Sequence, residues 1–174
     1  EQLEEAFREV LRGGNFILGD NVVAFESAFA KYTGSNFCVG VGNGTDALTI
    51  ALRCFGFQQG AEVIVPSNTY LATVLAVIHA GLKPVLVEPD IRTYNLDPEL
   101  VEAAITSNCV AIIPVHLYGK CCHMDDLKTL AGRHNLRIIE DCAQAHGARY
   151  NGQHAGTVGD FGAFSFYPTK NLGA

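Results

Sequence analysis

A lysine near the end of the sequence, Lys170, follows a stretch that is typical of a buried strand. Apolar and small residues run from Phe161 to Phe166, and Pro168, which has no N–H group to donate, stops any β-ladder. A lysine just past a strand end can be partly desolvated, which lowers the pKa of its amine and lets it attack an aldehyde. On this stretch alone an ordinary exposed loop lysine is the commoner explanation, so the chemistry depends on what else gathers around Lys170.

A second candidate is the carboxylate of Asp141, which stands at the end of another predicted strand, in the run Ile138-Ile-Glu-Asp141. A buried aspartate stays ionised only if something cationic faces it, and a protonated pyridine nitrogen would serve. The alternative is a structural aspartate held by backbone N–H groups. Gln144 is near enough in sequence to reach the same ligand. Tyr70 could lay its ring on a flat cofactor, although a core or hydrogen-bonded tyrosine explains it as well.

The glycine-rich turn from Gly42 to Asp46 leads from a predicted strand into a predicted helix. Free N–H groups at the helix start, together with the Thr45 hydroxyl, suit an anionic group such as a phosphate. The alternative is that Thr45 only caps the helix. A dinucleotide fingerprint fails, because Thr45 stands in place of the last glycine and no acidic residue ends the next strand near Ser67. A P-loop fails too, because no Gly-Lys-Ser/Thr follows.

Composition excludes several classes of protein. The 174 residues are 48% hydrophobic and leave room for one globular core, and the net charge of −6 without a Lys/Arg cluster argues against a nucleic-acid surface. No apolar run reaches the roughly 18 residues of a membrane span. The six cysteines lie mostly in apolar runs, which favours free thiols in a reducing cytosol. The pattern Cys121-Cys122-His123 has no second ligand pair at zinc spacing, so no metal site is predicted.

The elements that position these residues can be predicted from periodicity and glycine stops. Two helices come first, over residues 2–11 and from a cap at Asp20 to Gly34. Strands are then predicted over 36–41, 62–65, 84–87, 109–115, 136–140 and 163–166, and helices over 45–55, 69–80, 98–105 and 124–134. This alternation predicts an α/β fold, a three-layer αβα sandwich with a mostly parallel sheet. Because ligands bind beyond the carboxyl ends of such strands, the candidate residues should converge on one rim.

Several motifs in order resemble the DegT/DnrJ/StrS family of sugar aminotransferases, over essentially the whole chain. The stretches that carry the resemblance are Gly19–Glu26, Gly42–Leu48, Glu62–Ser67, Thr93–Asp97, Pro114–Gly119, Glu140–Gly147 and Ser165–Gly173. The resemblance implies the fold of type I transferases that depend on pyridoxal 5′-phosphate (PLP). It also implies that Lys170 forms the Schiff base with PLP and moves a proton, and that Asp141 keeps the pyridine nitrogen protonated.

The remaining cofactor contacts are also implied by the resemblance. Gln144 would contact the phenolic oxygen and Tyr70 would stack on the ring. Thr45, the backbone N–H of Asp46 and Ser165 would bind the phosphate. His146 lies beside these residues in the motif, but no role is assigned to it.

The function implied by the resemblance is transfer of an amino group, from glutamate, to a nucleotide-linked keto-deoxysugar. Residues 67–72 and 87–95 are similar to the branch that aminates C-3 of 6-deoxyhexoses. Such enzymes are cytoplasmic homodimers of deoxyaminosugar pathways for polysaccharides or antibiotics. Some relatives carry histidine in place of the lysine and act as dehydratases, so Lys170 favours transamination. A PLP sugar dehydratase, a non-catalytic sensor or binding module that kept the fold and, more distantly, a dinucleotide-dependent oxidoreductase are the alternatives.

The length of the chain departs from the family pattern. Members continue past the position of Lys170 into the rest of the large domain and a smaller C-terminal domain, and the partner subunit completes the phosphate site. We therefore expect residues 1–174 to be a partial PLP-binding large domain, opened by an N-terminal helix and linker over 1–14, with the C-terminal domain outside this chain.

Overall fold

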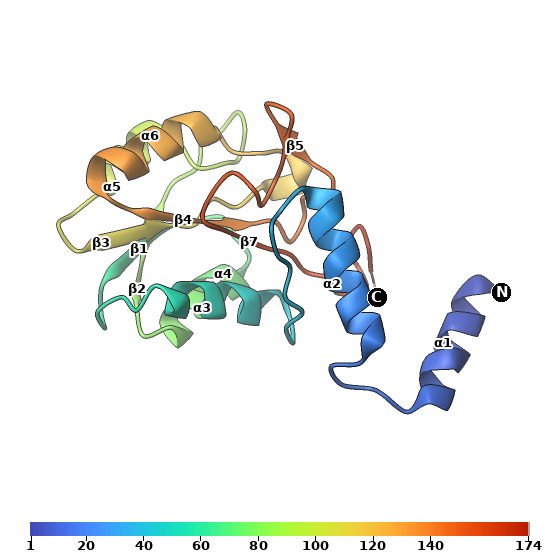
Figure 1. Cartoon of the computed structure of the whole chain (residues 1–174). Coiled ribbons are helices and arrows are strands. Elements are labelled where there is room, and N and C mark those ends of the chain that lie inside the picture. Colours follow the sequence, from blue (N-terminus) through green and yellow to red (C-terminus); the bar gives the residue numbers. More distant parts are fainter. Residues whose placement is uncertain (174) are drawn as a thin grey trace. The chain divides into compact units, whose positions relative to one another are not determined.

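The computed structural model describes residues 1–173, which form two compact units, residues 1–40 and the residues from 41 onward. The smaller unit consists of helices α1 (Gln2–Gly13) and α2 (Asp20–Thr33) (Figure 1). Each ends at a glycine in the left-handed region, with φ of 70° at Gly14 and 78° at Gly34, as the sequence predicts. Asp20, predicted as the N-cap, is instead the first helical residue, where its carboxylate still favours the positive end of the helix dipole.

Residues 36–41, predicted as a strand, form no β-ladder in the described part of the chain. A strand needs a neighbour to pair its backbone groups, and an apolar stretch alone does not supply one. The N–H of Gly40 donates instead to the Glu26 carboxylate at 2.6 Å. The apolar pattern therefore indicates an extended segment, and the prediction of a strand was wrong.

The larger unit is built on a five-stranded sheet with the order β2-β1-β3-β4-β7, in which every neighbouring pair is parallel. The strands are β1 (Glu62–Pro66), β2 (Lys83–Val87), β3 (Cys109–Ile112), β4 (Arg137–Asp141) and β7 (Phe161–Ala163). The helices are α3 (Gly44–Cys54), α4 (Leu71–His79), α5 (Pro98–Ala104) and α6 (Met124–His134), with a short 3-10 turn η1 (Leu117–Gly119). None of the described helices combines the length and apolar character needed to cross a membrane.

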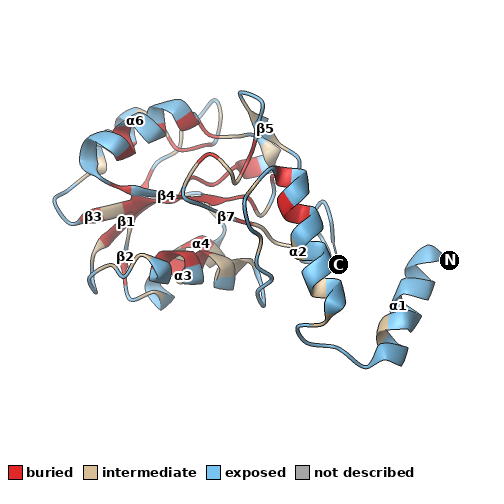
Figure 2. Ribbon diagram, in the orientation of Figure 1, coloured by how far each residue is buried: buried red, intermediate tan, exposed pale blue. Residues whose placement is uncertain are grey.

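Helices cover both faces of this sheet (Figure 1). Val63 and Val65 of β1 are fully buried in one apolar cluster with residues of α3 and α4, while Ile64 between them is buried in a second cluster with residues of α5 and α6. Figure 2 shows the buried residues concentrated in the strands and on the sides of α3, α4 and α6 that face them. Since side chains alternate between the faces of a strand, this pattern confirms the predicted three-layer αβα sandwich.

Two strands differ from their predicted bounds: β7 begins and ends earlier than the predicted 163–166, and β3 ends before the predicted residue 115. The strand β7 pairs with β4 only from Phe161 to Ala163, because β4 itself ends at Asp141, opposite Ala163. Residues 164–166 therefore have no ladder to join. Likewise β3 ends at Ile112, and Val115 makes only an isolated bridge to Asp141.

The structure adds a hairpin that was not predicted, formed by β5 (Arg149–Tyr150) and β6 (Gln153–His154). Its two-residue turn is Asn151-Gly152, and both residues have positive φ, 48° and 85°. Asn-Gly is the preferred sequence for such a turn, so the signal was present in the sequence.

Candidate active site

The carboxylate of Asp141 lies at the carboxyl end of β4, and the residue is 6% exposed. The hydroxyl of Thr73 on α4 donates to its Oδ2 at 2.8 Å, and the Ala143 N–H donates to its Oδ1 at 3.1 Å. Burial raises the pKa of Asp141, and these two hydrogen bonds, followed by smaller contributions from His116 and Lys170, offset the rise in part. Asp141 is therefore a buried acid with few donors around it, which suits a cationic partner.

Lys170 lines a cavity of about 480 Å³ together with Tyr118, Gln144, Thr169 and Asn171. Its backbone N–H closes a turn by donating to the Tyr167 carbonyl at 2.8 Å. The side-chain oxygen of Gln144 accepts the N–H of Tyr118 at 3.3 Å, which directs the amide toward the same space. The structure thus brings two residues singled out in the sequence, Gln144 and Lys170, to one cavity, whereas Asp141 is not among the residues that line it.

The turn before α3 lies against Ser165. A Cβ atom placed on Gly44 would come within 3.1 Å of the Ser165 Cβ, so only glycine lets the start of this helix approach the serine so closely. Asn43, and not Thr45, caps the helix, because its Oδ1 accepts the Asp46 N–H at 2.9 Å. Thr45 as the cap was therefore the wrong alternative. The Asp46 N–H, predicted as a phosphate donor, is engaged by Asn43 in this structure.

Tyr70 occupies the N-cap position of α4, and the residue is 79% exposed. Its carbonyl accepts the N–H of Thr73 at 3.0 Å, so the residue that touches Asp141 follows Tyr70 by one helical turn. Sequence reasoning missed Thr73, although its spacing of three residues from Tyr70 places the two side chains on one side of the helix. The sequence placed Tyr118 on the rim, after a predicted strand, but gave it no role, and the structure puts it in the lining of the Lys170 cavity.

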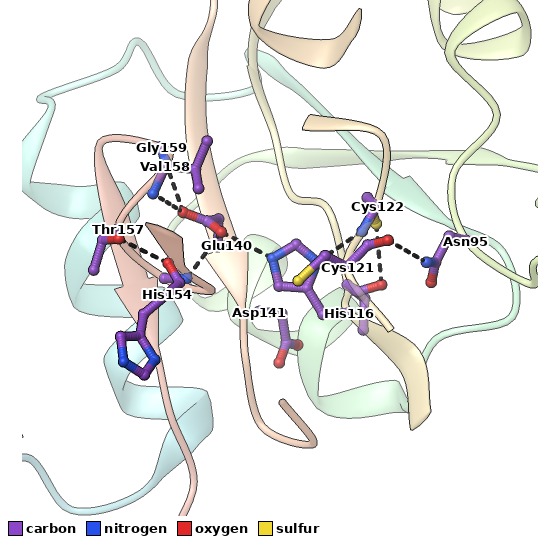
Figure 3. Close-up of polar contacts among 12 residues, drawn as sticks. Asn95, His116, Cys121, Cys122, Glu140, Asp141, His154, Thr157, Val158 and Gly159 are labelled. Carbon is purple, nitrogen blue, oxygen red and sulfur yellow. Dashed lines mark hydrogen bonds and ion pairs between the residues drawn. The ribbon is translucent and has the colours of Figure 1, made fainter. Parts of the chain in front are cut away.

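A second polar cluster joins His116, Glu140 and Cys142 on the side of β4 away from the Asp141 carboxylate. Figure 3 shows the contact between His116 and Glu140. All three residues are 0% exposed, and their potential ligand atoms lie within 4.8 Å of one another. Both carboxylate oxygens of Glu140 and both ring nitrogens of His116 are engaged in hydrogen bonds within the protein. A metal ion would have to break these bonds, so the cluster is better described as a hydrogen-bond network. None of the residues of the run Cys121-Cys122-His123 belongs to this cluster, and His123 is exposed at the start of α6.

His146 packs beside the lysine segment. Its ring lies 5.5 Å from the Phe164 ring and 5.1 Å from the Phe166 ring, measured between centroids. Burial lowers the pKa of its imidazole. The neutral form is therefore favoured next to Lys170.

Comparison with known proteins identifies the family. The chain matches the DegT/DnrJ/EryC1/StrS aminotransferase family over residues 1–174. It is similar to a dTDP-3-amino-3,6-dideoxy-alpha-D-galactopyranose transaminase of Aneurinibacillus thermoaerophilus, with 53% identity over 166 residues that cover 95% of this chain and 46% of that protein.

Solved structures agree with this match. The chain is similar to DesV of S. venezuelae, with a TM-score of 0.96 and 51% identity over 99% of this chain and 46% of that one. It is also similar to NtdA of Bacillus subtilis with bound cofactor PMP, with a TM-score of 0.90 and 37% identity over 97% of this chain and 38% of that one. The chain spans about half the length of the curated relatives it matches. As its motifs predicted, the chain belongs to the DegT/DnrJ/EryC1/StrS aminotransferase family.

Proposed function

We propose that the protein is a PLP-dependent aminotransferase that transfers an amino group from glutamate to C-3 of a nucleotide-linked keto-deoxysugar. The observation that carries this proposal is a buried Asp141 carboxylate at the carboxyl end of β4, together with Lys170 and Gln144 in the lining of one cavity. The family match and the named transaminase support the reaction class and the kind of substrate. Glutamate as donor, a homodimer and a cytoplasmic location stay predictions from the resemblance.

The residues present fit PLP. The cofactor carries a phosphate, a basic ring nitrogen, a phenolic oxygen and an aldehyde, and each has a chemically matched residue on this rim. The start of α3 packs closely against Ser165 at Gly44, so the Ser165 side chain lies beside the first turn of this helix, where backbone N–H groups favour an anionic group such as a phosphate. Burial raises the pKa of Asp141, so a cationic partner such as a protonated ring nitrogen would stabilise its ionised form.

Each residue then has a definite task. When bound, PLP supplies an electron-withdrawing ring that accepts electrons released from the substrate carbon. Asp141 would hold the proton on the ring nitrogen, with Thr73 keeping its carboxylate in place. Gln144 would bind the phenolic oxygen from the side of the cavity, and Tyr70 would cover one face of the ring. Lys170 would bind the cofactor through Nζ and then use that nitrogen to hold and move a proton.

The phosphate would be held at the start of α3. Thr45 has a hydroxyl that is not used to cap the helix, and Ser165 lies beside Gly44. Asp46 would offer its N–H only by sharing it with Asn43 or by releasing it from the bond present here. We therefore give Thr45 and Ser165 the larger part in binding the phosphate.

The test is to add PLP to the protein, reduce with borohydride and locate the label by mass spectrometry. We expect label on Lys170, and its loss in Lys170→Ala but not in Lys128→Ala, which changes an exposed lysine on α6. Label elsewhere, or undiminished label in Lys170→Ala, would contradict the assignment.

A second measurement separates the reaction classes. Incubation with glutamate and a nucleotide-linked 3-keto-6-deoxyhexose should release 2-oxoglutarate in step with amino sugar. Consumption of the keto sugar without consumption of any amino donor would indicate a dehydratase. Bound PLP that does not react with glutamate would indicate a sensor or binding module.

A further inference from the structure

Glu140 and Asp141 are consecutive residues at the end of β4, and their side chains contact opposite layers. Asp141 meets Thr73 on α4, whereas Glu140 meets His116 and the loop of residues 155–160 that leads into β7. Glu140 and His116 are both 0% exposed. A carboxylate buried this completely needs a reason, because removing the charge from water is costly unless donors replace the water.

Four donors surround the Glu140 carboxylate. Its Oε1 accepts the N–H groups of Val158 at 2.8 Å and Gly159 at 2.7 Å (Figure 3). Its Oε2 accepts the Gly156 N–H at 2.9 Å and faces His116 Nε2 at 2.8 Å. Burial acts to raise the pKa of Glu140, but the bonds from His116, Gly159 and Gly156 outweigh it and lower the pKa. Glu140 is therefore ionised and holds this loop through the backbone N–H groups of Gly156, Val158 and Gly159. We call this set of hydrogen bonds the clamp.

His116 is itself held in one tautomer. The Cys122 N–H donates to its Nδ1 at 3.1 Å, so Nδ1 carries no proton. The ring proton must lie on Nε2, from which His116 donates to Glu140. His116 is thus the fourth donor to the carboxylate, and it links Glu140 to the segment after β3.

The clamped loop packs directly on the segment that carries Lys170. A Cβ on Gly162 of β7 would overlap the backbone of Gly156, and a Cβ on Gly156 would lie 2.7 Å from the ring of Phe164. Phe164 immediately precedes Ser165, and Lys170 follows five residues later. Since β7 pairs with β4 over only three residues, Ile139 to Asp141, the sheet alone holds this segment weakly.

We propose that Glu140 is a positioning residue, which clamps residues 156–159 through its buried carboxylate and so sets where Ser165 and Lys170 stand relative to Asp141. His116 supports it by holding the carboxylate from the other side. The effect on Lys170 chemistry rests on the proposed PLP function, whereas the effect on the loop does not. An isosteric Glu140→Gln change puts an NH2 group where one carboxylate oxygen now accepts hydrogen bonds from two donors. The hydrogen bonds from the donors on that side, either His116 and Gly156 or Val158 and Gly159, must therefore break.

Glu62→Gln is the matched control. Glu62 is also a buried strand carboxylate, 8% exposed, and it accepts bonds from Lys83 and Thr106 at the opposite end of the sheet. Both variants would be compared with the parent by urea unfolding, by amide hydrogen exchange without cofactor, and by the rate at which PLP is trapped on Lys170.

We expect Glu140→Gln to speed exchange in the peptide from 155 to 173 by about tenfold, with little change in β1. Trapping on Lys170 should slow by about tenfold as well, since small misplacements of a reacting group carry costs of this size or more. Glu62→Gln should leave both quantities at the parent level even where it lowers stability. A purely structural role of Glu140 would lower the urea midpoint without changing trapping in folded molecules.

The proposal is overturned if folded Glu140→Gln matches Glu62→Gln in exchange and in trapping. Should Glu140→Gln fail to fold, His116→Gln carries the test, because it keeps the carboxylate and its three backbone donors. Unchanged exchange of residues 155–173 and unchanged trapping in His116→Gln would then overturn it. If the parent itself takes up no PLP, the proposed function fails, and the exchange measurement still decides on the clamp.

Discussion

Thr73 donates a 2.8 Å hydrogen bond to the Asp141 carboxylate and thereby joins the first turn of α4 to the end of β4. Thr73 is 1% exposed, and its hydroxyl also lies 2.8 Å from the hydroxyl of Thr69. Thr69, Thr73 and Asp141 thus form a short chain of hydrogen bonds. The hydrogen bond from the Thr73 hydroxyl makes an ionised Asp141 less costly, because it lowers the pKa that burial raises.

The first prediction concerns Thr73→Val, which keeps the shape of the side chain and removes its hydroxyl. The pKa of Asp141 should rise further, and the ionised form that binds a cationic ring nitrogen should become scarcer. A hydrogen bond to a charged group contributes about 1.5–3 kcal/mol, so PLP affinity should fall by about tenfold or more in an absorbance titration. Thr129→Val is the control, because Thr129 is exposed and bonds only to Asp125 of its own helix. Equal PLP affinity in the two variants would contradict the role of Thr73.

The second prediction is that Asp141→Asn separates stability from function. An asparagine can still accept the Ala143 N–H and donate to Thr73, which can donate in turn to Thr69. It cannot balance a cationic ring nitrogen. Turnover should therefore fall by roughly a hundredfold or more, the usual cost of losing one preorganised electrostatic group. Retained turnover would show that Asp141 is not the partner of that nitrogen.

The stability of Asp141→Asn should depend on pH with a definite sign. The pKa of Asp141 is raised in the folded protein above its ordinary value of 3.8, so ionisation of this residue disfavours folding at neutral pH. The variant should thus be more stable than the cofactor-free parent at neutral pH. The difference should shrink as pH falls through the folded pKa and vanish below about 3.8, where both states are protonated. Urea titrations across pH would measure it, with the exposed Asp126→Asn as the control. A less stable variant at neutral pH would contradict the sign.

The third prediction concerns Gly44→Ala, which places a methyl group 3.1 Å from the Ser165 Cβ. Overpacking of this kind costs about 1–3 kcal/mol, and here it would push Ser165 away from the start of α3. PLP affinity should fall by about tenfold, and inorganic phosphate should compete less well for the site. The matched change is Gly132→Ala inside α6, where a Cβ meets nothing within 4 Å. It should raise stability by about 0.5–1 kcal/mol and leave PLP binding unchanged. Equal PLP affinity in the two variants would count against a phosphate site at the start of α3 beside Ser165.

Much of the fold follows from local sequence signals. Alternation of short apolar strands with helices predicted the parallel sheet and its two helical layers, and glycines marked the helix ends. The convergence of Gln144 and Lys170 on one cavity followed from a general property of parallel sheets, whose carboxyl ends meet at one edge. These predictions succeeded because they depend on patterns that each segment carries by itself.

The remaining features depend on contacts that no single segment encodes. The segment 36–41 has the composition of a strand, but its place in a ladder depends on a partner elsewhere. Nothing in the apolar helix sequence around Thr73 indicates a functional role, because its contact with Asp141, 68 positions away in sequence, exists only in the folded protein. Asn and Thr side chains can both cap a helix, so the sequence does not decide between Asn43 and Thr45. Asn43 is the cap because its backbone is extended and the helix begins at the next residue.

The last prediction concerns the thiols next to the two acids. Cys142 directly follows Asp141 and is 0% exposed, and Cys122 beside His116 is equally buried. Burial raises the pKa of Cys122 to about 12 and raises that of Cys142 well above its usual value. Both thiols should therefore stay neutral at neutral pH, which leaves the negative charge at this strand end to Glu140 and Asp141. A thiolate there would repel both carboxylates and weaken the clamp and the cofactor site alike.

Alkylation with iodoacetamide tests this directly. In the folded protein at neutral pH the exposed Cys54 should be labelled first, while Cys122 and Cys142 should react only after unfolding, because the thiolate is the reactive species and neither sulfur is accessible. Peptide mass spectrometry over time would give the rates, and the same reaction in urea would show that all the cysteines are intrinsically reactive. Labelling of Cys122 as fast as Cys54 in the folded protein would mean that the core beside His116 opens readily. The Glu140 network could then not hold the lysine segment in place.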